Sequence, residues 1–153
     1  MRVGFGWDSH RLVQGLPLII GGVHIPFNKG EDGHSDGDVL THAVIDALLG
    51  AAALGDIGSH FPPSEGKWKD AESLKLLETV CTLIRNHGYE IGNIDTTLVL
   101  EAPKFSPYRD HVRSAVSHAA GIDKSQISVK VKTAEGLDSV GSGESIEAYA
   151  QAL

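Results

Sequence analysis

Three side chains of the kinds that bind metal ions lie in the first third of the sequence. Asp8 and His10 are two residues apart, so in an extended segment both side chains lie on one face. His42 lies in a stretch whose apolar residues recur with a helical period. Two imidazoles and one carboxylate leave a fourth position on a zinc ion open, which is the pattern of catalytic rather than structural zinc. The sequence therefore predicts a catalytic zinc site between a strand end and a helix.

The alternative is that Asp8 caps a turn and that both histidines are ordinary polar residues. Against this, the chain has 8 histidines among 153 residues. Asp38 and Asp46 also lie one helical turn to either side of His42. A metal-bound imidazole commonly donates its second N–H to such a carboxylate. We therefore favour the metal site and expect one of these two carboxylates to hold the ring of His42.

A second candidate feature precedes the same helix. Ser35 is a suitable N-cap, and His34 lies beside it. Free N–H groups at a helix N-terminus bind anions, so a phosphate could bind here near the metal. A simple cap by Ser35 is the alternative, and the two interpretations are compatible.

Weaker signals occur at three turns or strand ends. The Asp56-Ile57-Gly58 turn could accept hydrogen bonds from substrate hydroxyls. Thr133 follows a predicted strand and could donate to a phosphate, and Glu135 could bind a hard cation such as magnesium. The segment 102–106 could offer backbone amides to the edge of a base. Taken alone, each segment is more typical of a solvated turn, a charged strand end or an ordinary loop.

Composition excludes several classes of protein. The formal net charge of -7 argues against nucleic-acid binding, although bound metal ions could still attract a small phosphorylated substrate. Cys81 is the only cysteine, so no internal disulfide forms, and its apolar neighbours predict a core residue. No segment resembles a signal peptide or approaches the length of a membrane span. We expect a soluble intracellular protein without nucleic-acid or membrane partners.

The elements that must position these residues follow from periodicity and turn signals. These signals predict an α+β fold in a single domain over residues 1–153. The fold would have a mixed four-stranded sheet, helices layered on one face of it and a small N-terminal hairpin. The second sheet face would be bare, which favours self-association. The four expected strands of the sheet are 2–7, 91–100, 127–133 and 146–153, and the last of these could instead be a helix; the hairpin is expected at 17–26. The expected helices are 35–49, 71–87 and 108–120. The expected loops are 28–33, 55–66 and 136–143.

The sequence as a whole resembles one enzyme family, the 2-C-methyl-D-erythritol 2,4-cyclodiphosphate synthases. The resemblance covers nearly the whole chain, and its most specific part is the block from His34 to Gly58. The matching motifs are Gly6-x-Asp8-x-His10, His34-Ser35-Asp36-Gly37-Asp38, Gly55-Asp56-Ile57-Gly58, Gly88-Tyr89-Glu90-Ile91-Gly92-Asn93, Pro103-Lys104 and Lys132-Thr133-x-Glu135.

The resemblance implies an activity and an assembly. Such enzymes convert 4-diphosphocytidyl-2-C-methyl-D-erythritol 2-phosphate into a cyclic diphosphate and CMP, in the non-mevalonate pathway of isoprenoid synthesis. They are homotrimers with active sites between subunits. The implied location is the cytoplasm, or the plastid if a transit peptide has been removed.

The resemblance also implies roles for individual residues. Zinc would be held by Asp8, His10 and His42, and a second cation, magnesium or manganese, by Glu135. His34 and Thr133 would stabilise the transition state. The residues implied to contact substrate are Asp8, His10, His34, Ser35, Asp56, Ile57, Gly58, Phe61, Leu100, Ala102, Pro103, Lys104, Phe105, Ser106, Lys132, Thr133 and Glu135.

Two alternatives remain for the function. One is a metal-dependent nucleotide phosphohydrolase that releases linear products. The other is a non-catalytic trimer that binds zinc or an isoprenoid. It would not need Thr133, Glu135 or the cytidine segment, residues 100–106, which the resemblance implies would bind cytidine.

Overall fold

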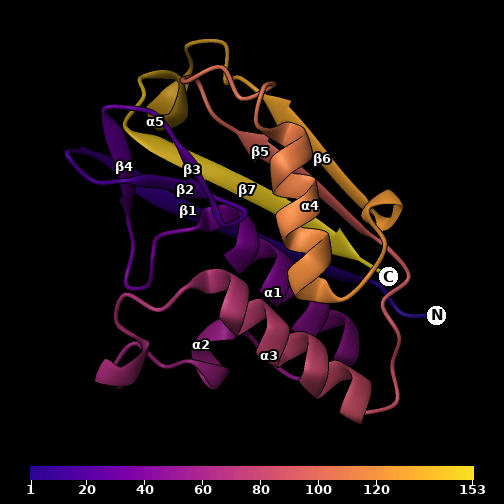
Figure 1. Ribbon diagram of the computed structural model, residues 1–153. Coiled ribbons are helices and arrows are strands. Elements are labelled where there is room, and N and C mark those ends of the chain that lie inside the picture. The colour runs from indigo at the N-terminus through magenta and orange to yellow at the C-terminus, as the bar shows by residue number, and fades with distance from the viewer.

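A computed structural model describes all residues, 1–153, as a mixed sheet covered on one face by helices (Figure 1). The strands are β1 (Gly4–Gln14), β2 (Leu18–Ile20), β3 (Val23–Ile25), β4 (Lys29–Asp32), β5 (Ile94–Val99), β6 (Ile127–Lys132) and β7 (Ser145–Ala152). The helices are α1 (Val39–Ala52), α2 (Ile57–His60), α3 (Ser73–Asn86), α4 (Arg109–Ala120) and α5 (Asp138–Gly141), with 3-10 turns at Gly66–Trp68 and Lys124–Gln126. The predicted α+β class is confirmed.

The main sheet has five strands, in the order β4-β1-β7-β5-β6. Strand β7 is its centre, and it pairs antiparallel with both β1 and β5, while β5 and β6 are parallel. The C-terminal segment is therefore a strand and not a helix, because its alternate residues Ile146, Ala148 and Ala150 are buried. The predicted hairpin is also present as β2 and β3, which turn at Gly21 and Gly22.

The prediction of four strands was wrong, because β4 was expected to be a loop. Its sequence Lys-Gly-Glu-Asp lacks the apolar and β-branched residues that mark a strand. It pairs with the second half of β1, which continues seven residues beyond the predicted end at Trp7. Tertiary pairing along this long edge overrides the local preference for a loop.

Helix α1 lies against the middle of the sheet, and two glycines of β1 allow the contact. A Cβ atom on Gly4 would lie 1.8 Å from the carbonyl oxygen of Ala47, and one on Gly6 would lie 2.0 Å from that of Ala43. Any larger residue would push the helix away. Because side chains alternate along a strand, Asp8 shares the helix-facing side with these glycines.

Helix α1 begins four residues later than predicted. Its N-cap is Asp38, whose carboxylate accepts a hydrogen bond from the Thr41 amide at 3.0 Å, and Ser35 lies outside the helix. The helix ends at Ala53, which takes the left-handed conformation, rather than at Gly50. The predicted cap at Ser35 was wrong because Asp38 also binds the β2–β3 turn, which fixes the start of the helix at this point.

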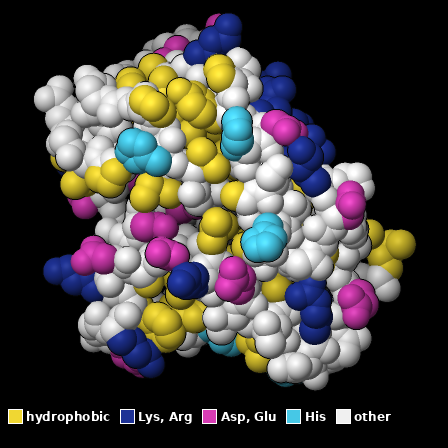
Figure 2. Space-filling model, in the orientation of Figure 1, with side chains coloured by type: hydrophobic (Ala, Val, Ile, Leu, Met, Phe, Trp, Pro, Cys, Tyr) yellow, Lys and Arg dark blue, Asp and Glu magenta, His cyan; other side chains and the backbone are white.

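The other two long helices complete one layer over the sheet. Helix α4 packs on β6, and α3 packs on α1 and α4 (Figure 1). Their boundaries agree with the predicted ranges to within two residues, and Gly121 ends α4 in the left-handed conformation. Basic and acidic side chains are interspersed over this helical face (Figure 2). None of the helices combines the length and apolar character needed to cross a membrane.

The opposite face of the sheet carries no helix, as predicted. Phe5 and Trp7 point to this side of β1 and remain 61% and 48% exposed. The Phe5 ring lies 6.4 Å, between centroids, from the Tyr149 ring on β7. A second protein surface could bury these aromatic side chains.

Candidate active site

The structure brings together the three predicted metal ligands from β1 and α1. Asp8 Oδ2 lies 3.1 Å from His10 Nε2 and 3.0 Å from His42 Nδ1. One ligand atom from each residue lies within 4.8 Å of the others. The rings of His10 and His42 meet edge to face, with 5.2 Å between centroids. Two nitrogens and one oxygen facing a common point fit a divalent metal ion with an open coordination position.

The outer nitrogen of each imidazole is held by the protein. His10 Nδ1 lies 2.8 Å from both Glu31 Oε2 and the Gly37 carbonyl oxygen. His42 Nε2 lies 2.9 Å from the hydroxyls of Ser35 and Ser73. Such contacts fix the ring orientation and the tautomer of a metal ligand. The arrangement is that of a prepared metal site.

The expected carboxylate partners of His42 were wrong. Asp38 is fully buried and accepts hydrogen bonds from Gly21, Gly22 and Thr41. Asp46 accepts one from the Ile57 amide at 2.8 Å. Asp38 and Asp46 do lie one helical turn from His42, but their carboxylates bind backbone amides and the Thr41 hydroxyl instead of its ring.

Electrostatics at the cluster favour a cation. Burial would raise the pKa of the Asp8 carboxyl, but hydrogen bonds to His10 and His42 hold that pKa below its ordinary range. Burial would lower the pKa of His10, but the Asp8 and Glu31 carboxylates outweigh it and raise that pKa. A proton thus supplies the positive charge in the metal-free protein, and a bound metal ion would displace it.

A cavity of about 230 Å³ opens over the cluster and contains several predicted residues. His34, Ser35, Ile57, Gly58 and Phe61 line it together with the three ligands. Asp56 is not in its lining, because its carboxylate caps α2 through the Ser59 amide and hydroxyl. The remaining lining residues are Pro63, Trp68 and Leu76.

Two amides at the helix N-terminus behind the cavity already have partners. The Val39 amide donates to Glu31 Oε2 at 3.0 Å, and the Thr41 amide donates to Asp38. These two amides are not free to bind an anion, and the anion site at the start of this helix stays a prediction. His34 and Ser35 line the cavity, so their side chains are available to contact a phosphate there.

The predicted cytidine segment and the Thr133–Glu135 pair form a second group at the ends of β5 and β6. The Leu100 amide donates to the Lys132 carbonyl at 2.9 Å, and the Ala134 amide donates to Glu101. Thr133 Oγ1 donates to Glu135 Oε1 at 2.8 Å. Parallel pairing of β5 and β6 explains this proximity, because both strands end at the same edge.

Within one chain the two groups do not share a cavity. None of residues 100–106 or 132–135 lines the cavity at the metal cluster. Strand β7 separates β1, which carries Asp8 and His10, from β5 and β6. In the second group Leu100 and Phe105 are buried, whereas Ala102, Lys104, Ser106, Lys132, Thr133 and Glu135 are exposed.

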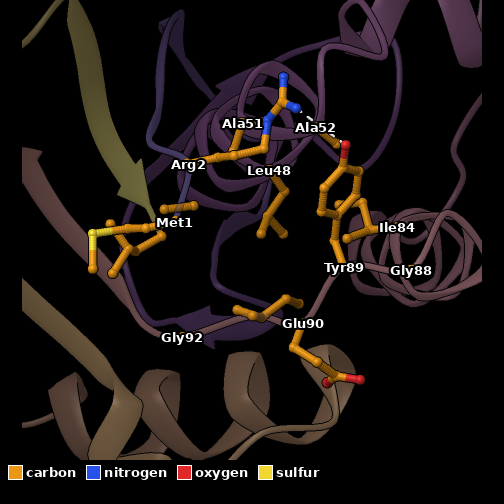
Figure 3. A pocket seen from close by; sticks show the side chains of 13 residues that line it. Met1, Arg2, Leu48, Ala51, Ala52, Ile84, Gly88, Tyr89, Glu90 and Gly92 are labelled. Atoms are coloured by element: carbon orange, nitrogen blue, oxygen red, sulfur yellow. Dashed lines mark hydrogen bonds between the residues drawn. The ribbon is translucent and has the colours of Figure 1, made fainter.

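A larger cavity, of about 470 Å³, lies near the two chain termini (Figure 3). Its lining is mainly apolar and includes Leu48, Ile84 and Tyr89, while Arg2 bonds to the Tyr89 hydroxyl and to the Ala51 carbonyl. None of the predicted site residues lines it. The larger of these two cavities is therefore not the one that the predicted site residues line.

The sequence interpretation missed three contributors to the metal site. Ser73 contacts His42 and bonds through its own hydroxyl to Asp36. Trp68 packs on Phe61 in the cavity wall, with 5.0 Å between ring centroids. Glu31 lies in the segment that was assigned as a loop, and no local pattern marks it as a partner of His10.

Comparison with known proteins agrees with this fold and shows the family of the chain. The chain belongs to the YgbB family, whose model matches residues 1–153. A 2-C-methyl-D-erythritol 2,4-cyclodiphosphate synthase of Treponema denticola is 52% identical over 100% of this chain and 95% of its own length. The synthase of Desulfatibacillum aliphaticivorans is 55% identical over 97% of this chain and 96% of its own. A solved structure of such a synthase in a CDP-bound form superposes with a TM-score of 0.91, at 36% identity and 99% coverage of both chains.

Proposed function

We propose that the chain converts 4-diphosphocytidyl-2-C-methyl-D-erythritol 2-phosphate into 2-C-methyl-D-erythritol 2,4-cyclodiphosphate and CMP. It is a phosphorus–oxygen lyase of isoprenoid (terpenoid) biosynthesis by the non-mevalonate pathway. The observation that carries the proposal is the Asp8, His10 and His42 cluster beside a cavity, in a chain about half identical to synthases of that name. We place the whole chain in one domain and the protein in the cytoplasm.

The reaction joins two parts of one molecule. An oxygen of the 2-phosphate attacks the β-phosphorus, a new P–O bond forms, and the bond from that phosphorus to the oxygen bridging the α-phosphate breaks. CMP leaves with the bonding electrons. The nucleophile is already an anion, so no general base is needed, and the main barrier is repulsion between phosphates. Holding the substrate bent supplies the orientation, and positive groups reduce the repulsion.

The metal cluster and Glu135 supply the cation sites in this proposal. Asp8, His10 and His42 hold zinc, which suits their nitrogen and oxygen donors. Glu135 binds magnesium or manganese, for which a carboxylate is the suitable ligand. Cations held by these residues would supply positive charge that offsets the repulsion between the phosphates.

The remaining side chains orient the substrate. His34, Ser35 and Thr133 donate to phosphate oxygens, with His34 and Thr133 stabilising the charge that develops in the transition state. Residues 56–58 bind the methylerythritol hydroxyls beside Phe61. Residues 100–106 and Lys132 bind the cytidine part.

A homotrimer would complete the site. The two groups of predicted residues lie on opposite sides of β7 and share no cavity in one chain. The helix-free sheet face also exposes the apolar side chains of Phe5 and Trp7. Packing of these faces around a threefold axis would bury them and bring the metal cluster of one subunit to the cytidine segment of its neighbour.

The experiment measures CMP release from the substrate, with and without a zinc chelator, and identifies the product by phosphorus NMR. We expect chelator-sensitive release together with a cyclic diphosphate. Linear phosphate products would instead indicate a metal-dependent nucleotide phosphohydrolase. Absence of turnover with zinc bound would indicate a non-catalytic binding trimer.

A further inference from the structure

Glu31 lies on the edge strand β4 with its side chain buried behind the metal cluster. The side chain is 0% exposed. Its Oε2 lies 2.8 Å from His10 Nδ1 and accepts a hydrogen bond from the Val39 amide at 3.0 Å. Its Oε1 is buried and has no hydrogen-bond partner. A carboxylate in this position needs a compensating positive charge nearby.

The contact falls on the side of His10 that faces away from the cluster. His10 Nε2 faces Asp8, so Nδ1 is free to donate to Glu31. The Gly37 carbonyl lies at the same distance, 2.8 Å, from this nitrogen. The carbonyl alone could fix the ring. Glu31 adds a carboxyl group whose ionised form burial disfavours, so a positive charge at the cluster is what keeps it negative. An acceptor of this kind makes an imidazole a stronger metal ligand.

Local packing holds Glu31 in place. A Cβ atom on Gly37, whose φ is +79°, would lie 2.8 Å from the Glu31 carbonyl oxygen and 3.0 Å from its Cβ. The strand and the loop before α1 thus meet at their closest approach beside Glu31. The carboxylate has little freedom to turn away from His10.

We propose that Glu31 is a positioning residue of the metal site, which orients His10 and whose buried charge strengthens binding of a divalent cation. Glu31 touches neither the cation nor the substrate and acts through His10. The inference rests on the proposed function only in taking Asp8, His10 and His42 as metal ligands. The competing role is structural, because Glu31 also accepts from the first amide of α1.

The test compares zinc affinity of the wild type, Glu31→Gln and Asp32→Asn by competition between zinc chloride and a chromogenic chelator. Glutamine keeps the size and an acceptor for the Val39 amide but removes the charge. Asp32 is the next residue of β4 and is exposed, so Asp32→Asn is a matched change of charge away from His10. We expect about a 10-fold or larger loss of affinity for Glu31→Gln and less than about a 2-fold change for Asp32→Asn.

Two further measurements separate positioning from structure. The melting temperature of metal-free Glu31→Gln should stay close to that of the wild type, because glutamine keeps an acceptor for the Val39 amide. The visible spectrum of the cobalt-substituted protein should change in Glu31→Gln and not in Asp32→Asn, because a neutral partner makes His10 a weaker ligand. If Glu31→Gln does not fold, Glu31→Leu, of similar volume, serves the same comparison and should lose at least as much affinity.

The outcomes are distinct. A zinc affinity of the Glu31 variant equal to that of the wild type overturns the inference. A weaker affinity that accompanies an equally destabilised metal-free protein also overturns it, because capping of α1 then explains the loss. A wild type that binds no zinc contradicts the proposed function instead, since the comparison between variants then has no metal site to report on.

Discussion

Each histidine of the metal cluster has one ring nitrogen that faces the metal position and one that contacts other protein groups. His10 directs Nε2 inward and Nδ1 to Glu31 and Gly37. His42 does the reverse, with Nδ1 inward and Nε2 against Ser35 and Ser73. A metal ion bound by the two inner nitrogens would therefore require opposite tautomers of His10 and His42. Small side-chain changes around either ring should alter metal binding.

The first prediction concerns His42. His42→Ala removes one nitrogen ligand of three, so zinc content should fall from about one ion per chain to about a tenth or less. CMP release should fall about 100-fold or more, because the site loses its positive charge. Elemental analysis and a CMP assay on the same preparation test this, with circular dichroism as the check of folding. A variant that retains full zinc content would contradict the assignment.

The second prediction concerns Cys81, which is buried on α3. Burial raises the pKa of its thiol to about 11. Because only the thiolate reacts, and because reagent cannot reach a buried group, native protein should not react with a disulfide reagent at pH 8. One thiol per chain should titrate after unfolding in guanidinium. Rapid reaction of the native protein would show that α3 opens or that Cys81 is exposed.

At the scale of elements, the start of α1 organises the site. Asp38 lies at this point and joins two segments of the chain, since it accepts hydrogen bonds from Gly21 and Gly22 of the β2–β3 turn and from Thr41 of α1. It thereby ties the β2–β3 turn to the helix that carries His42. The position of that ligand depends on a residue that never touches the metal.

Asp38→Ala should therefore destabilise the fold. The change leaves several buried donors unsatisfied and removes the N-cap, which should cost about 2–4 kcal/mol. Urea denaturation of the metal-free protein measures the difference. The control is Asp123→Ala, which removes the exposed cap of the 3-10 turn at Lys124–Gln126 and should cost about 1 kcal/mol or less. Similar losses for both variants would contradict the importance given to Asp38.

The sequence predicted those elements whose signals are local. The leucine period of α3, the glycine after α4 and the alternation of β6 each indicated the correct element. The metal ligands could be found because two lie two residues apart on a strand and the third lies on a helix. Strand β4 and the cap at Asp38 were missed, because distant pairing and the β2–β3 turn determine them. The contact of Glu31 with His10 spans 21 residues and follows from β4, so it could not be predicted either.

At the scale of the whole molecule, the two groups of predicted site residues lie in different parts of one chain. The metal cluster lies between β1 and α1, whereas the cytidine segment and Glu135 lie beyond β5 and β6. A reaction that needs both groups requires a second chain, and the helix-free sheet face can provide the contact. The proposed active site is then a property of the assembly, as the resemblance to the synthase family implies.

The most direct test of this account is complementation between two inactive variants. His42→Ala damages the metal cluster, and Thr133→Ala damages the phosphate-binding segment. Each variant alone should form almost no cyclic diphosphate. When equal amounts are co-expressed and assemble at random, about a quarter of all shared sites should combine two intact parts, so about a quarter of wild-type cyclisation should return. No recovery in mixed trimers would contradict a site assembled from two subunits.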